Sequence, residues 1–230
     1  MDATATAGND DTEIIPDDIF AKLQQKAVNE SRLGIPVIFG RDVIHGHHTV
    51  LPFPLAMAAA FNPEQVRLCY RDVAAEAARE GVHWSFSPML DLSRDPRWGR
   101  CVESPGEDPY VGMKMAEAVV KGFQGDDLSK PDCIAACCKH YIGYGASEGG
   151  RDYHKAEISD YTLRNYYLKA FKSAVDSGVQ TVMNSFNEIG GQPTASSHYL
   201  LTEVLRDELG FDGYVISDWN AVSQLIEQGV

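Results

Sequence analysis

Short apolar runs alternate along this chain with longer segments in which apolar residues recur at helical spacing. The runs predict strands at residues 34–40, 84–86, 133–138, 179–183 and 214–216. The helical spacing predicts helices that begin near Asp17, Asn62, Asp108, Ser159, Leu200 and Asn220. Strands that alternate with helices pair in parallel through right-handed crossovers. The pattern therefore predicts an α/β fold with a parallel sheet.

Polar or charged residues follow each predicted strand and precede the next helix. They are Asp42, Arg100, Lys139, His140, Asn184 and Asp218. The carboxyl ends of parallel strands share one rim, where TIM barrels carry their active sites. A closed (β/α)8 barrel needs eight strands, and the pattern predicts about five. We expect an incomplete TIM-barrel-like domain over residues 16–230, after a polar, acidic lead-in at residues 1–15.

The charge of the chain argues against two classes of partner. Its 230 residues include 20 Lys and Arg against 33 Asp and Glu, a net charge of −13. An acidic surface repels phosphate backbones and anionic lipids, so we expect no nucleic-acid or membrane partner. No apolar run reaches the length of a membrane span.

The N-terminal residues and the cysteines suggest a cellular setting. The first residues contain neither the basic nor the apolar region of a secretory signal. Five cysteines are present, an odd number, and their spacing is not typical of a disulfide framework. We expect reduced thiols and a cytoplasmic location.

The last predicted strand ends at a carboxylate, Asp218, followed directly by Trp219. A carboxylate just beyond a buried strand is a reactive group on a rigid support. The alternative is that Asp218 caps the helix that begins near Asn220, which is a common role for aspartate. The gathering of polar residues on one rim favours the reactive role.

Six motifs, in order, resemble those of glycoside hydrolase family 3, the β-glucosidases and their relatives. They are GRDVIHG at 40–46, RDPRWGR at 94–100, ESPGED at 103–108, KHY at 139–141, EGGRDY at 148–153 and VISDW at 215–219. The family fold is a β/α barrel followed by an α/β sandwich domain. The resemblance implies that this chain is most of the barrel.

The resemblance also implies roles for individual residues. Asp218 matches the nucleophile that forms the covalent glycosyl-enzyme intermediate. Residues that match the sugar-holding positions are Asp42, Arg100, Lys139 and His140, and Trp219 resembles an aromatic wall of the site. In many members the general acid/base is a glutamate of the second domain, which has no counterpart in this sequence.

These residue types suit glycoside hydrolysis with retention, in which one carboxylate attacks and a second carboxyl group protonates the leaving oxygen. Lys139 and Arg100, in the same pocket, would stabilise an ionised Asp218. Asp42 can accept hydrogen bonds from two hydroxyl groups, and such charge-assisted bonds are strong. The chemistry requires no metal or organic cofactor.

Each of these residues also has a structural interpretation. Asp42 could form an Asx turn, and the Lys139-His140 pair could be a solvated strand end. Among the arginines of the 94–100 motif, we expect Arg100 to bind substrate, and Arg94 and Arg97 to form structural ion pairs.

His45, His47 and His48 resemble a metal cluster at first sight. No cysteine or carboxylate recurs near them at ligand spacing, so we interpret the loop as an entrance to the site. The other conspicuous side chains are expected to pack in the core: Trp84, Trp98, Cys133, Cys137 and Cys138.

Asp152 and His154 offer a different acid/base. The N-acetylglucosaminidase branch of the family uses an Asp-x-His pair on this loop. The preceding residues, 141–145, lack the proline and second histidine of that branch, and the EGGRDY motif favours the glucosidase and xylosidase branch.

The sequence thus predicts a retaining, exo-acting β-glycosidase, with β-glucosidase favoured, acting on a β-linked glucoside or oligosaccharide. A C-terminal α/β sandwich domain would supply the acid/base. Two alternatives stay open: an N-acetyl-β-glucosaminidase that uses Asp152 and His154, and a non-catalytic sugar-binding or assembly fragment that needs the rest of the enzyme.

Overall fold

The computed structural model describes residues 17–227, so the predicted lead-in lies outside the described residues. The helices and strands are α1 Asp17–Glu30, β1 Gly40–Arg41, α2 Pro54–Ala59, α3 Pro63–Arg79, β2 Trp84–Ser85, α4 Pro109–Gln124, β3 Ala135–Tyr141, α5 Asp160–Thr162, α6 Leu168–Asp176, β4 Thr181–Asn184, β5 Glu188–Ile189, β6 Gln192–Pro193, β7 Tyr214–Ile216 and α7 Ala221–Glu227.

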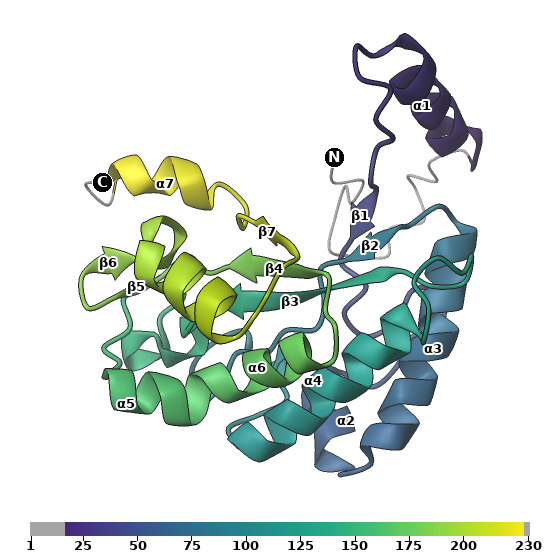
Figure 1. The fold of residues 1–230 in the computed structure, drawn as a ribbon. Helices are drawn as coiled ribbons and strands as arrows, with labels where there is room; N and C mark the ends of the chain where they lie inside the picture. The colour runs from purple at the N-terminus through teal and green to yellow at the C-terminus, as the bar shows by residue number, and fades with distance from the viewer. Residues whose placement is uncertain (1–16, 228–230) are drawn as a thin grey trace.

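Five parallel strands form one sheet in the order β1-β2-β3-β4-β7. Helices α2, α3, α4 and α6 lie against one face of this sheet, whereas α7 lies beyond the opposite face (Figure 1). Because closure requires eight strands, the described residues form an incomplete β/α barrel, as the alternating pattern predicts.

The central strand β3 presents its side chains alternately to two apolar environments, as a strand buried on both faces requires. Ala136 and Cys138 belong to the main core between sheet and helices. Cys137 faces the other side, where it packs with Trp84 and Met183. The expected packing roles of Cys137, Cys138 and Trp84 are therefore confirmed.

The helical layer is held by a close approach of α3 and α4. A Cβ atom on Gly122 would lie 2.6 Å from the Cβ of Tyr70 and 2.8 Å from the carbonyl oxygen of Arg67, so only glycine fits at this contact. The rings of Tyr70 and Phe123 pack edge to face with centroids 5.0 Å apart, and both residues are buried.

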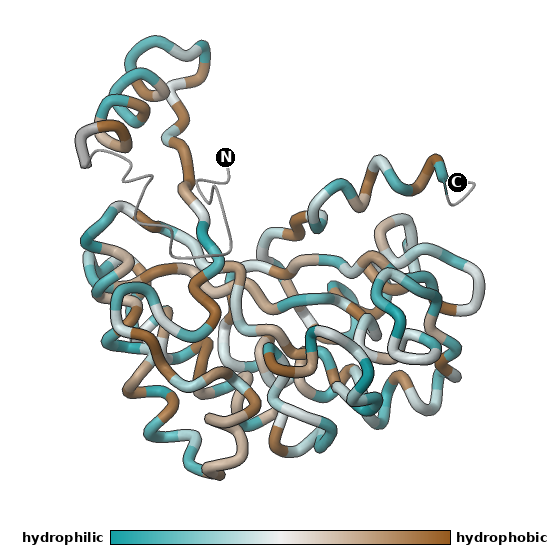
Figure 2. Tube along the Cα trace, turned by 180° about the vertical axis from the view of Figure 1, so that it is seen from behind, coloured by the Kyte–Doolittle hydropathy of each residue, from teal (hydrophilic) through white to brown (hydrophobic). Residues whose placement is uncertain are grey.

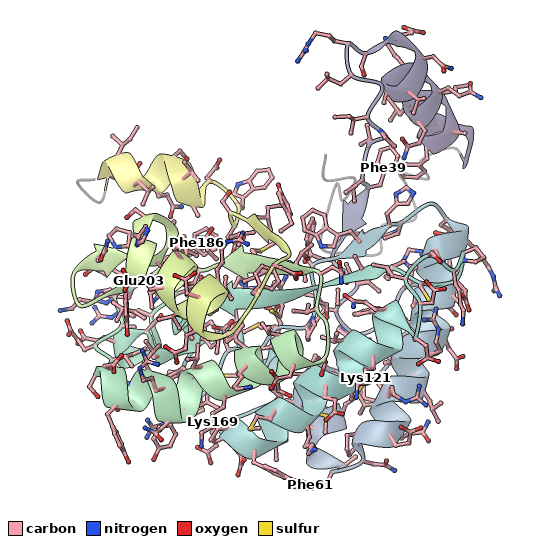
Figure 3. The ribbon with its side chains drawn as sticks, in the orientation of Figure 1. Phe39, Phe61, Lys121, Lys169, Phe186 and Glu203 are labelled. Atoms are coloured by element: carbon pink, nitrogen blue, oxygen red, sulfur yellow. The ribbon has the colours of Figure 1, made fainter. Side chains whose placement is uncertain are left out.

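Helix α1 extends away from the sheet (Figure 1). The segment that links it to β1 is hydrophobic for much of its length (Figure 2), and Ile35 and Ile38 are each 61% exposed. At the base of this arm, Phe39 packs against Phe20 and His83, with ring centroids 4.7 and 5.7 Å apart (Figure 3).

The strand predicted at residues 34–40 is wrong for most of its length, because strand pairing begins only at Gly40. The physical reason lies in α1, whose Gln24 side chain accepts from the Val37 amide at 2.9 Å and donates to the Val37 carbonyl oxygen. These bonds satisfy the Val37 backbone without a neighbouring strand.

Three further features were not expected from the pattern. Helix α2 precedes α3, and π-helical turns occupy Leu163–Tyr167 and Tyr199–Glu208 within segments predicted as ordinary helix. Strands β5 and β6 form a small antiparallel hairpin. Its turn residues, Gly190 and Gly191, both have positive φ, so the Gly-Gly pair was an available hairpin signal.

Within residues 17–227, no helix combines the length and the apolar character needed to cross a membrane.

Candidate active site

A pocket of about 680 Å³ opens at the carboxyl ends of the strands. Its lining includes six residues that the sequence assigned to catalysis or substrate binding: Asp42, Arg100, Lys139, His140, Asp218 and Trp219. They follow or end β1, β3 and β7, or lie in the long loop between β2 and α4. Distant segments therefore meet at one rim, which is the arrangement of a barrel's active face.

Two consecutive side chains of β3, Lys139 and His140, both line the pocket. Neighbours in a regular strand face opposite sides. Here the pairing of β3 with β4 shifts register between Cys138 and Tyr141, so the regular alternation does not hold at these two residues. Their side chains are only 5% and 1% exposed, so the interpretation as a solvated strand end is wrong.

The ammonium group of Lys139 donates to Oδ1 of Asp42 at 2.8 Å. This ion pair joins the ends of β1 and β3 across the pocket floor, and it holds the Asp42 carboxylate in place rather than in a local Asx turn. About one third of the Asp42 side chain stays exposed to the pocket. Its carboxylate is thus fixed yet accessible to a ligand's hydroxyl groups.

Asp91 anchors His140 from behind. Oδ2 of Asp91 accepts from the His140 backbone amide at 2.9 Å and lies 2.7 Å from Nδ1 of the same residue. Burial raises the pKa of Asp91 to about 7, although the His140 amide and the charge of Arg100 act in the opposite direction.

Burial also lowers the pKa of His140 well below its usual range, and the positive charges of Arg100 and Lys139 act in the same direction. The imidazole is therefore neutral near pH 7. When Nδ1–H donates to Asp91, Nε2 carries no proton and lies 3.3 Å from Oδ2 of Asp218. We assign this tautomer from the hydrogen bond to Asp91.

The two oxygens of Asp218 are in different situations. Oδ1 accepts from the Trp219 amide at 2.6 Å. Oδ2 lies 3.3 Å from Nε2 of His140, but this oxygen is buried and makes no hydrogen bond with any described residue. One oxygen is therefore held, and the other has no hydrogen-bond partner in the described residues.

The alternative role of Asp218 as a helix cap does not fit this geometry. Its side chain binds the Trp219 amide, which precedes the first residue of α7, Ala221. A capping side chain would instead accept from an amide inside the first helical turn.

Arg100 is fixed by Glu103 in a bidentate pair, with Nε and Nη2 at 2.7 and 2.9 Å from its oxygens. Its guanidinium group also lies 5.7 Å from the centre of the Tyr144 ring. The Glu103 carboxylate raises the pKa of Arg100 despite burial, so the group remains charged at the pocket wall.

The two other arginines of this loop lie outside the pocket lining. Arg97 pairs with Asp95 at 2.6 Å on the surface, and Arg94 lies over the Tyr166 ring at 5.7 Å. The geometry therefore places Arg100 at the pocket and leaves Arg94 and Arg97 in structural contacts.

The pocket mouth is aromatic and histidine-rich. Trp219 is 73% exposed and lines the pocket, together with His45 and His47 of the loop that we interpreted as an entrance. Asn184, predicted on the same rim, is buried and donates to the Ser185 carbonyl oxygen, outside the lining.

Asp152 and His154 do not line the pocket. Oδ1 of Asp152 accepts from Nε1 of Trp98 at 2.9 Å. Trp98 is buried against Tyr144, with centroids 5.2 Å apart, and so has the expected packing role. In this chain, Asp152 therefore supports the buried aromatic cluster behind the pocket.

The sequence did not predict that Asp91 and Tyr144 contact His140. Asp91 follows the apolar pair Met89-Leu90 on the same rim, so the signal used for the other residues was present. The ring of Tyr144 packs edge to face on His140 at 5.1 Å. No spacing in the sequence indicates this contact, because it depends on the path of the loop after β3.

Comparison with known proteins agrees with this geometry. The model of the glycosyl hydrolase family 3 N-terminal domain matches residues 7–230. The chain is 41% identical to a periplasmic beta-glucosidase of Salmonella typhimurium over 90% of its length, and 36% identical to a beta-xylosidase of Formosa agariphila over 91%.

Among solved structures, the beta-glucosidase of Listeria innocua in complex with glucose is similar, with a TM-score of 0.88 and 44% identity over 90% of this chain. Its complex with laminaribiose, determined on a D270A mutant, gives a TM-score of 0.90 over 92% of this chain. The chain spans only 27% of the Salmonella protein and about 30% of the Listeria protein.

Proposed function

The chain belongs to glycoside hydrolase family 3, and from this premise we propose that it is the nucleophile-bearing barrel portion of a retaining, exo-acting β-glycosidase. One observation carries the proposal. Just beyond the carboxyl end of β7, Asp218 lines the pocket; one of its carboxylate oxygens accepts a hydrogen bond from the Trp219 amide, and the other, buried beside Nε2 of His140, has no hydrogen-bond partner among the described residues.

In this proposal Oδ2 of Asp218 attacks the anomeric carbon and forms a covalent glycosyl ester. Retention requires a second carboxyl group about 5–5.5 Å from the first, which protonates the leaving oxygen and then activates water. We place that acid/base in a part of the enzyme outside this sequence, in an α/β sandwich domain. Oδ1 of Asp152 accepts a hydrogen bond from the Trp98 indole, and Asp152 lies outside the pocket lining.

The other pocket residues position the sugar. The Asp42 carboxylate accepts from two adjacent hydroxyl groups, while Lys139 and Arg100 donate to ring hydroxyl oxygens. Nε2 of His140 accepts from one further hydroxyl. The exposed Trp219 ring packs on the apolar face of the sugar at the pocket mouth.

We propose a β-linked glucoside or oligosaccharide as the substrate. The relatives include both a beta-glucosidase and a beta-xylosidase, so the proposed sugar class is a β-linked pyranoside with equatorial hydroxyls. The Listeria protein, similar in fold and sequence, was solved with glucose and laminaribiose. This similarity favours glucose over xylose.

Covalent labelling tests the nucleophile directly. The 230-residue chain is incubated with an activated aryl 2-deoxy-2-fluoro-β-glucoside, and the intact and digested protein is analysed by mass spectrometry. A good leaving group needs little acid assistance, so the reaction reports on the barrel itself. We expect one fluoroglucosyl group on Asp218.

Matched variants separate the possible outcomes. Asp218→Asn should abolish labelling, whereas Asp152→Asn should leave it intact. An adduct on another carboxylate would refute the assignment of Asp218. Sugar binding by the folded chain without any adduct would support the non-catalytic alternative. Reaction with an aryl N-acetyl-β-glucosaminide that depends on Asp152 would support the N-acetylglucosaminidase alternative.

A further inference from the structure

The entrance loop after β1 folds back as a tight hairpin. The Leu51 amide donates to the His45 carbonyl oxygen at 2.7 Å, and Gly46 pairs with Val50 in an antiparallel bridge. Gly46 has a φ of +134°, and a Cβ atom there would lie 2.2 Å from the Thr49 carbonyl oxygen, so the turn requires glycine. The tip of this hairpin carries His47 and His48.

Helix α3 presents two carboxylates, one turn apart, to the hairpin. Glu76 accepts from both the backbone amide and the hydroxyl group of Thr49, which fixes the turn. Glu80, at the C-terminal end of α3, lies between the two imidazoles. Its Oε2 is 2.7 Å from Nε2 of His47, and its Oε1 is hydrogen-bonded to Nε2 of His48.

We propose that His47, His48 and Glu80 form a binding site for one divalent transition metal, with Zn²⁺ as the best match. Two imidazole nitrogens and a carboxylate are a common zinc ligand set, and they leave a fourth position for water. Hard cations such as Ca²⁺ and Mg²⁺ prefer oxygen ligands, so they fit this set poorly.

The geometry needs little change to accept the ion. The three ligand atoms lie within 4.8 Å of one another. Tetrahedral ligands at about 2.0–2.1 Å from zinc stand roughly 3.3 Å apart, so small rotations of the side chains suffice. His47 is nearly buried, with 2% of its side chain exposed, whereas His48 is 69% exposed and gives the ion a route from solvent.

Local charge also suits a cation. Two carboxylates, those of Glu76 and Glu80, face the hairpin. Arg41 is the one arginine or lysine among the main charged neighbours of His47. The site went unnoticed in the sequence because Glu80 is 32 residues beyond His48. Only the packing of the hairpin on α3 brings the carboxylate to the histidines.

Bound zinc would tie the hairpin to the end of α3. His45, Gly46, His47 and Val50 line the pocket mouth, so the ion would fix one wall of the pocket. The proposal concerns metal binding alone and does not depend on glycosidase activity. A chain that fails to react with a glycoside can still bind zinc, and a chain that reacts with a glycoside can fail to bind zinc.

Isothermal titration of the tag-free chain with ZnCl₂, after removal of metal with a chelator, tests the proposal. We expect one equivalent of zinc to bind. At a zinc concentration of about 100 times Kd, the Tm should rise by roughly 5–10 °C. His48→Gln and Glu80→Gln should weaken binding more than tenfold, and MgCl₂ should have no effect.

His198→Gln is the matched control. This exposed histidine also lies beside a glutamate, Glu203, at 3.3 Å, but the pair includes only one imidazole. It should bind zinc like the unmodified chain. Cobalt serves as a spectroscopic probe: the bound ion should lack a thiolate charge-transfer band.

Absence of zinc binding by the unmodified chain would overturn the proposal. Equal binding by His48→Gln, a substitution at an exposed position that should not disturb folding, would overturn it too. A thiolate band would place the ion on cysteine and have the same consequence.

Discussion

The helix-covered face of the sheet and the carboxyl ends of its strands differ in chemical character. Towards α3, α4 and α6, the strands contribute mainly apolar side chains to the main core, and the hydrogen bond from the Ala136 amide to Gln124 of α4 is an exception to this apolar contact. At the carboxyl ends, charged groups bind one another across strands, as in the Lys139–Asp42 and His140–Asp91 contacts. The first region tolerates exchange of one apolar group for another, whereas the second depends on particular atoms at particular distances.

This difference predicts that substitutions separate into two classes. Substitutions at the rim should reduce activity and leave the fold intact, because the scaffold positions the rim side chains but depends little on them for its stability. Changes in the helical layer should do the reverse. For each variant, both the labelling rate and the Tm are measured.

Asp218→Asn should have the largest effect. An amide retains the shape and the bond from the Trp219 amide but is not a nucleophile. We expect the rate of labelling by the fluoroglucoside to fall at least about 10³-fold, with the Tm unchanged or raised. A variant that reacts at more than a tenth of the original rate would contradict the role of Asp218.

Phe123→Ala should produce the opposite result. This ring is fully buried against Tyr70 where α4 contacts α3. Truncation of such a residue costs about 3–5 kcal/mol of unfolding free energy, which corresponds to a Tm lower by roughly 10 °C. At a temperature where the variant is folded, its labelling rate should match that of the original chain. A specific loss of rate would show that the two regions are coupled.

Lys139→Met should act mainly on chemistry. The substitution keeps the length of a nearly buried side chain and removes the charge that pairs with Asp42. We expect the labelling rate to fall about 10²-fold, because a fixed donor that positions a sugar hydroxyl oxygen is lost. Asp42 is exposed enough to be hydrated, so the Tm should change little. A large loss of stability would instead identify the ion pair as a structural element.

The pH dependence of labelling should depend on Asp91. Burial raises its pKa to about 7, so below that pH the Asp91–His140 pair carries one extra proton. Nε2–H can then donate to Asp218 and weaken it as a nucleophile. The rate should therefore rise by about tenfold between pH 6 and pH 8.

Asp91→Asn should flatten this profile, because the substituted pair has no carboxyl group to titrate. The folding of the variant is checked by its Tm. An unchanged profile in the variant would mean that a different group controls the pH dependence.

Arg97→Ala should have the smallest effect. Arg97 binds Asp95 at 2.6 Å, but its side chain is 71% exposed and lies outside the pocket lining. Exposed ion pairs contribute little to stability. We expect the Tm to stay within about 2 °C and the labelling rate to be unchanged. A marked loss of rate would show that position 97, as well as Arg100, contributes to the pocket.

The same contrast explains how much could be predicted from the sequence. Apolar periodicity located the helical layer, because burial against a helix leaves a regular pattern in the chain. The rule that polar residues follow strands located Asp42, Lys139, His140 and Asp218, because a barrel collects those ends at one rim. The structure confirms the alternation of strands and helices and gathers these residues in one pocket.

The features that were missed depend on contacts between distant residues. The Asp91–His140 bond joins positions 49 residues apart, and the partner of Val37 is a side chain of α1 rather than a strand. Local pattern carries no record of such pairings. The π-helical turn at Leu163–Tyr167 was also missed, because nothing in the apolar spacing of this segment distinguishes it from an ordinary helix.

The register shift in β3 means that the number of residues before it decides which side chains face the core and which face the pocket. Before the register shift, alternate positions face the helical layer and the barrel interior; within it, the adjacent residues Lys139 and His140 both line the pocket. A single-residue deletion upstream in β3 would exchange packing residues for site residues along the strand. We therefore expect β3 to vary among natural variants by substitution and not by insertion or deletion.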